Sequence, residues 1–196
     1  AIKDMTLYKG GIPARYGGRV SSVLEVYQKE GNSKEYKISG GIGTIAGRLM
    51  AEGPIVRDKS AFLLGGRASY GQYFLPALDI DNSAYFYDLN AKVHYQFNER
   101  NKLYLSGYFG RDNFSLDGNY ANTYGNTVVN LRWNHLFSEK LFSNLSFIYT
   151  DYFFGLDLDL EGFRWDSNVR QLNFKFDLNN FNSEKVTTRY GFHNIY

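Results

Sequence analysis

The sequence predicts an all-β protein, in which one antiparallel sheet of long strands forms part of a transmembrane β-barrel. Polar and apolar residues alternate over stretches of about ten residues, and short polar clusters between these stretches recur roughly every 40 residues. Longer connections rich in Gly, Asn and Asp join the other ends of the stretches. Short turns at one rim and longer loops at the other are typical of outer-membrane barrels. The clusters occupy residues 57–59, 98–101, 138–140 and 182–185.

Composition agrees with a strand-rich chain. The 196 residues include 17 Tyr and 16 Phe but 3 Pro, and aromatic residues favour strands and membrane interfaces. No apolar run approaches the roughly 20 residues of a spanning helix, so strands of about 9 to 11 residues would make any membrane crossing. The chain has no cysteine, which excludes disulfide scaffolds. Its Lys and Arg residues form no basic stripe, so nucleic acid is not an expected partner.

The clearest predicted strand covers residues 86–98. Apolar residues such as Leu89 and Val93 share one face of this strand, and polar residues such as Lys92 and His94 share the other. Alternation of this kind indicates a strand with one face in contact with water. The same pattern recurs in residues 129–137, 145–153, 172–178 and 186–192.

A soluble β-sandwich also alternates, so alternation alone does not identify what covers the apolar face. Strands of globular proteins commonly have about 5 to 6 residues, whereas these segments keep their pattern for about ten or more, which suits a tilted crossing of a bilayer. Aromatic residues near the short turns indicate a girdle at one membrane interface. They are Tyr95, Phe97, Tyr104, Phe137, Phe142 and Phe181.

The N-terminal residues differ in character. Before Val26 the chain is rich in Gly and basic residues, which predicts a compact segment of brief strands and turns. Residues 28–34 are polar and are expected to form a flexible linker. The expected organisation is therefore an N-terminal unit, residues 1–33, followed by about nine wall strands in residues 34–196. Because open sheet edges leave backbone groups unsatisfied in lipid, these strands are expected to belong to a larger barrel.

Two passages carry a family resemblance. The segment from Tyr8 to Val26, YKGGIPARYGGRVSSVLEV, resembles the end of the plug domain of a TonB-dependent outer-membrane receptor. Residues 40–55, GGIGTIAGRLMAEGPI, and residues 62–70, FLLGGRASY, resemble the first barrel strands of that family.

The resemblance implies the fold and function of that family. The fold would be a 22-stranded barrel in the outer membrane of a Gram-negative bacterium, closed by a plug whose C-terminal segment is residues 1–33. The function would be energy-coupled import of a scarce nutrient, with outer-membrane lipid and the TonB system as partners and a surface lipoprotein as a further candidate. The TonB box would lie outside these residues. The alternatives are a passive outer-membrane porin or structural barrel, and a soluble β-domain that binds carbohydrate.

Candidate site residues follow from the expected barrel. Arg15 and Arg19 are predicted to contact the wall, because a charge in a partly dry lumen requires a partner. The sidedness of the barrel would place the four polar clusters at the periplasmic rim and residues 75–84, 116–124 and 156–167 at the extracellular rim. The residues predicted to line the lumen are polar members of the alternating strands: Arg48, Arg67, Lys92, His94, Arg132, Asn134, Lys175 and Arg189.

No enzymatic site, cofactor or confident metal site is predicted. The three histidines fall in three different predicted strands, without the local pairing of zinc sites, and no Ser/His/Asp arrangement or isolated carboxylate pair supports catalysis. Asp157, Asp159 and Glu161 share one face of an extended segment. These carboxylates are interpreted as part of a solvated hairpin, with a divalent-cation site as the alternative.

Overall fold

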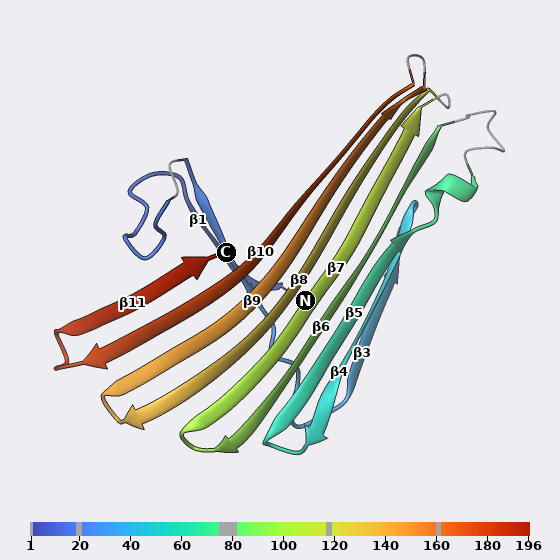
Figure 1. The fold of residues 1–196 in the computed structure, drawn as a ribbon. Coiled ribbons are helices and arrows are strands. Elements are labelled where there is room, and N and C mark those ends of the chain that lie inside the picture. Colours follow the sequence, from blue (N-terminus) through green and yellow to red (C-terminus); the bar gives the residue numbers. More distant parts are fainter. Residues whose placement is uncertain (1, 19–20, 75–81, 117–118, 160–161) are drawn as a thin grey trace.

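The computed structural model describes residues 2–18, 21–74, 82–116, 119–159 and 162–196 (Figure 1). Nine consecutive strands form one antiparallel sheet, in which each strand is hydrogen-bonded to its neighbours in sequence and β3 and β11 form the edges. The expectation of one continuous sheet from about residue 34 is confirmed. The strands are β3 (Lys37–Ile42), β4 (Ala46–Val56), β5 (Ser60–Ser69), β6 (Ser83–Asn98), β7 (Asn101–Leu116), β8 (Tyr120–Ser138), β9 (Leu141–Leu158), β10 (Phe163–Phe181) and β11 (Thr187–Ile195).

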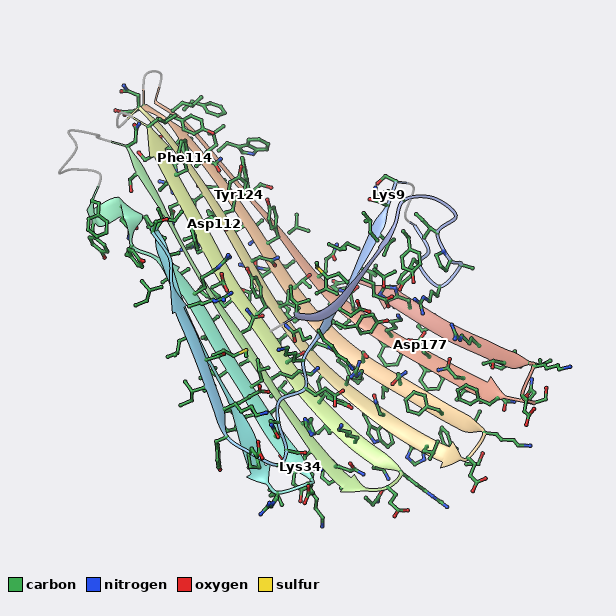
Figure 2. The ribbon with its side chains drawn as sticks, turned by 180° about the vertical axis from the view of Figure 1, so that it is seen from behind. Lys9, Lys34, Asp112, Phe114, Tyr124 and Asp177 are labelled. Atoms are coloured by element: carbon green, nitrogen blue, oxygen red, sulfur yellow. The ribbon has the colours of Figure 1, made fainter. Side chains whose placement is uncertain are left out.

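The N-terminal residues form a separate small sheet. β1 (Ile2–Tyr8) and β2 (Val23–Gln28) pair with each other and do not extend the large sheet. This hairpin lies behind the large sheet in Figure 1 and in front of it in Figure 2, so it covers one face. The structure also contains a 3-10 helix, η1 (Gly71–Tyr73). Within the described residues, no helix combines the length and apolar character that a membrane-spanning helix needs.

The four polar clusters predicted to be turns all join consecutive strands along one edge of the sheet, the lower edge in Figure 1. At the first of them, Asp58 has a φ of 61°, and the Lys59 amide donates to the Val56 carbonyl over 3.1 Å. Asp is one of the few residues that tolerate this left-handed conformation. The polar clusters are therefore tight turns that reverse the chain.

The opposite edge differs from the prediction. The expected loops at 116–124 and 156–167 are wrong in extent, because β8 already begins at Tyr120, β9 runs to Leu158 and β10 begins at Phe163. Only the connection from β5 to β6, which includes η1, is long, and residues 75–81 of it lie outside the described residues. β6 to β10 have between 16 and 19 residues each.

The burial of the two faces of the sheet is the reverse of that in a soluble protein, because apolar side chains are exposed and polar side chains are covered. On β6, Val93 and Tyr95 are each 38% exposed, whereas Lys92 is 8% and His94 is 6% exposed. Apolar residues normally occupy the protected side and Lys is almost never fully buried unless paired. We call the face that carries Lys92 the polar face and the face that carries Val93 the apolar face.

The register can be tested directly because the chain contains no cysteine. Ser106 of β7 is opposite Asn130 of β8 on the polar face. In a Ser106→Cys/Asn130→Cys variant the two Cβ atoms should be about 4.5 to 5.5 Å apart. We expect dibromobimane to bridge them, with the fluorescence that appears only when both thiols react.

A Ser106→Cys/Leu131→Cys variant is the matched control, because Leu131 is one residue further along β8 and lies on the opposite face. Equal bridging in both variants would show that the register given above is incorrect.

Candidate functional site

The polar face gathers all eight residues predicted to line a lumen. Arg48 is opposite Arg67, which is opposite Asp88 of β6, and His94 and Arg132 are both opposite Tyr104. Side chains alternate between faces with a period of two, so residues linked through this register share one face. The eight residues that the register places on the polar face are Arg48, Arg67, Lys92, His94, Arg132, Asn134, Lys175 and Arg189.

The last residue of β2 and the residues that follow it are held on this face. The Gln28 amide nitrogen donates to Asn90 Oδ1 over 3.3 Å, and Lys92 Nζ donates to the Gln28 carbonyl over 3.3 Å. Two residues further on, His94 Nδ1 lies 3.1 Å from the Glu30 carbonyl, and Lys102 Nζ lies 2.9 Å from Glu30 Oε2. We call these four interactions the docking contact. They show that the prediction of a flexible linker is wrong for its first residues.

Gly31 fixes the path of the chain next to the docking contact. Its φ is 84°, in the left-handed region that residues with a Cβ rarely adopt. A Cβ atom at this position would also lie 2.6 Å from the carbonyl oxygen of Phe62 on β5. Both the conformation and the close approach of the two backbones therefore require glycine.

Three cations of the polar face surround one aromatic ring. The ring of Tyr104, which is 6% exposed, lies 5.5 Å from Lys92 Nζ, 4.9 Å from Lys102 Nζ and 4.4 Å from Arg132 Cζ. An aromatic face attracts cations through its quadrupole, which partly offsets their mutual repulsion.

Burial acts to raise the pKa of Glu30, but its hydrogen bond to Lys102 and the nearby positive charges outweigh burial and lower the pKa from its ordinary value.

Arg15 does not have the partner that the sequence predicts. Its guanidinium pairs with Glu25 Oε2 over 3.1 Å and donates to the Tyr8 hydroxyl over 3.2 Å, and both partners belong to the N-terminal hairpin. The expected ion pair with the wall is corrected to one within the hairpin, because β2 brings Glu25 to the loop that carries Arg15. Arg19, the second predicted contact, lies outside the described residues.

Two clefts separate the N-terminal segment from the polar face. One has a volume of about 770 Å³ and lies between Arg15 with its neighbours and the strands that carry Lys175, Asp177 and Arg189. The other has a volume of about 740 Å³ and is lined by Gln28, Arg48 and Asp88, among others. Both clefts combine cationic, acidic and neutral polar groups with apolar side chains.

The carboxylates considered for a divalent cation do not form a described cluster. Asp157 is exposed on β9, Asp159 follows the end of that strand, and Glu161 lies outside the described residues. Within the part of the chain that the structure describes, no group of three or more His, Asp or Glu side chains is placed to hold a metal ion.

Sequence reasoning did not identify Gln28, Glu30 or Lys102. It assigned Tyr104 to an aromatic girdle, whereas the structure buries this residue on the polar face. Lys102 and Tyr104 have the same parity in β7 as the polar residues of that strand, so extension of the alternation to residue 102 would have placed them on the polar face. Nothing in the sequence indicates that Glu30 pairs with Lys102, because the two are separated by 72 residues.

Comparisons with protein-family models, with curated proteins and with solved structures gave no match for this chain.

The ion pair between Glu30 and Lys102 should stabilise the docked segment. Glu30→Gln is expected to lower the free energy of unfolding by about 0.5 to 1 kcal/mol, the upper part of the range for partly exposed pairs, because the Glu30 side chain is 42% exposed. Urea unfolding of the intact protein in detergent, followed by tryptophan fluorescence, measures the change.

Glu35→Gln is the matched control, since Glu35 pairs with Lys37 only at 3.8 Å and both side chains are more than half exposed. The pKa of Glu30 is lowered in the folded state. The stability that its charge contributes is therefore fully present above the pKa of the unfolded chain and is lost as the pH falls through the folded pKa. The difference in the free energy of unfolding between wild type and Glu30→Gln should therefore be largest near pH 7 and should decrease below about pH 4. A difference that grows with acidity would contradict the assignment.

Proposed function

We propose that this chain is part of the wall of an outer-membrane transport barrel of the TonB-dependent receptor class, and that residues 1–33 are the end of its plug. The observation that carries the proposal is the reversed character of the two faces, with charged residues covered and large apolar residues exposed. A sheet with this reversal is stable where lipid covers the apolar face and the polar face encloses water.

The composition of the apolar face supports a lipid contact. On β3 to β11, the rows level with Ala91 to Phe97 carry no Lys, Arg, Asp or Glu on this face, whereas Arg111, Asp151 and Arg170 lie in the two rows above them. The charge-free rows extend about 20 Å along a strand, at about 3.4 Å per residue. With the usual barrel tilt of about 35–45°, this corresponds to about 15 Å of height, the larger part of the apolar band of about 25 Å in outer-membrane barrels.

The N-terminal hairpin supports the plug assignment. It forms its own sheet, lies on the polar face and is joined to that face by the docking contact. The sequence resemblance between residues 8–26 and plug domains points in the same direction. Energy-coupled import of a nutrient, dependence on the TonB system and a location in the outer membrane are proposed by analogy with that family.

A passive porin is the second candidate, because the two clefts leave open space beside the N-terminal segment. The carbohydrate-binding soluble domain has less support. A sandwich would bury its apolar face against a second sheet, whereas the described residues leave the apolar face of all nine strands without such cover.

Labelling of single-cysteine variants tests the orientation of the faces. Val93→Cys and Phe174→Cys, labelled with bimane in the intact protein in liposomes, should be quenched by nitroxide-bearing lipids. Lys175→Cys and Arg189→Cys should instead be quenched by iodide in the water phase. The opposite result would reverse the faces and remove the main support for a membrane wall.

Conductance in planar bilayers separates the plugged transporter from the porin. The intact wild-type protein should conduct rarely, because the docked segment occludes the lumen. A Glu30→Gln/Lys102→Met variant should open more often, since it removes the ion pair between these side chains, one of the four docking interactions. Steady conductance of the wild-type protein, unchanged in the variant, would favour the porin.

A further inference from the structure

Toward the upper edge of the sheet in Figure 1, the polar face carries aromatic residues and the apolar face carries polar ones. The register continues without interruption, but the polar face becomes aromatic there. Phe114 is opposite Asn122, and Tyr124 is opposite Phe154. The rings on this part of the polar face, which we call the aromatic strip, belong to Phe114, Tyr120, Tyr124, Phe154 and Trp165.

The rings of the aromatic strip form two groups of contacts on four strands, Phe114 with Tyr120, and Phe154 with both Tyr124 and Trp165. The ring centroids are 6.2 Å apart for Phe114 and Tyr120, 5.3 Å for Tyr124 and Phe154, and 5.5 Å for Phe154 and Trp165. Figure 2 shows Phe114 and Tyr124 in the upper part of the sheet. Phe114 is 41%, Tyr124 42% and Trp165 53% exposed. A contiguous exposed patch of large apolar side chains usually marks a binding surface.

The other face at this height is polar, which argues against lipid as the occupant. Asp151 accepts hydrogen bonds from Asn168 and from Arg170, and Arg164 pairs with Asp166 over 3.0 Å. These side chains lie on the continuation of the apolar face. If that face meets lipid below them, they mark the upper limit of the bilayer, and the aromatic strip then stands above it on the inner side of the wall.

Charge and hydrogen-bonding groups beside the strip indicate what it binds. On β7 to β10, the described residues of the strip's rows include one charged side chain, Asp112, and no Lys or Arg. Ser167 and Asn126 add neutral polar groups on the same face. An anionic ligand would meet no positive charge there, and a purely apolar one would leave these polar groups without partners.

We propose that the aromatic strip binds an uncharged oligosaccharide at the mouth of the barrel. The C–H groups on one side of a pyranose ring are weakly positive and pack on the negative face of an aromatic ring. Its hydroxyl groups can pair with Asp112, Asn126 and Ser167. The inference rests on the proposed function, since it names the class of nutrient that the transporter would meet first.

Fluorescence of Trp165 gives a direct measurement. Trp133 and Trp165 are the two tryptophans of the chain, so a Trp133→Phe background leaves Trp165 as the reporter. The intact protein in detergent is titrated with maltohexaose, cellohexaose and xylohexaose. We expect at least one of these neutral probes to change the emission with saturable binding. Tyr124→Ala should weaken that binding at least tenfold, whereas Phe153→Ala, an aromatic change on the opposite face, should leave it unchanged.

Two results would overturn the inference. One is the absence of saturable binding by all three neutral probes. The other is tighter binding of an anionic hyaluronan hexasaccharide or of a leucine-rich hexapeptide than of any neutral probe. The labelling of Val93→Cys and Lys175→Cys tests the proposed function separately. If the faces are oriented as proposed but no sugar binds, the transporter proposal stands and the substrate inference fails.

Discussion

The structure depends on the hydrogen-bond register of nine sequential strands, which shifts only beside three of the tight turns. Side chains alternate with a period of two, and a slip of one residue at any turn would move every later side chain to the other face. Instead, the register connects Arg48 on β4 to Arg189 on β11 through one face. Each tight turn therefore does more than connect two strands, because it also fixes which side chains of the next strand lie on the polar face. The polar face, its docked hairpin and the aromatic strip all require that the pairing register is kept at each turn.

The sheet and its faces could be predicted because they depend on local patterns. Alternation such as that around Val93 and Lys92 is visible in sequence, and polar clusters between strands mark the turns. The eight residues proposed for the lumen consequently lie on one face. The same rule explains the error at residues 116–124 and 156–167. The alternation continues there, but aromatic residues occupy the positions that lower down are polar, so an interpretation based on one constant pattern ends the strands too early.

Contacts between distant segments could not be predicted from local patterns. Arg15 requires a carboxylate, yet sequence alone does not distinguish Glu25 on its own hairpin from an acid on the wall. In the sequence, Glu30 resembles any other acidic residue of a polar segment. Its role is evident only from the ion pair that it forms with Lys102 in the structure. Gly31 likewise stands in a polar stretch that resembles a linker, and its requirement for glycine depends on the backbone of Phe62.

The position of the docking contact also constrains the order of assembly. Its four interactions join residues separated by 62 to 72 positions, whereas each turn of the sheet joins strands that follow one another directly. Closing a long loop costs more chain entropy than closing a short one, so local hairpins form sooner. The surface that receives Gln28, Glu30 and Gly31 is made by β5, β6 and β7 together. The N-terminal segment, although first in the chain, can therefore reach its final position only after at least these three strands have paired.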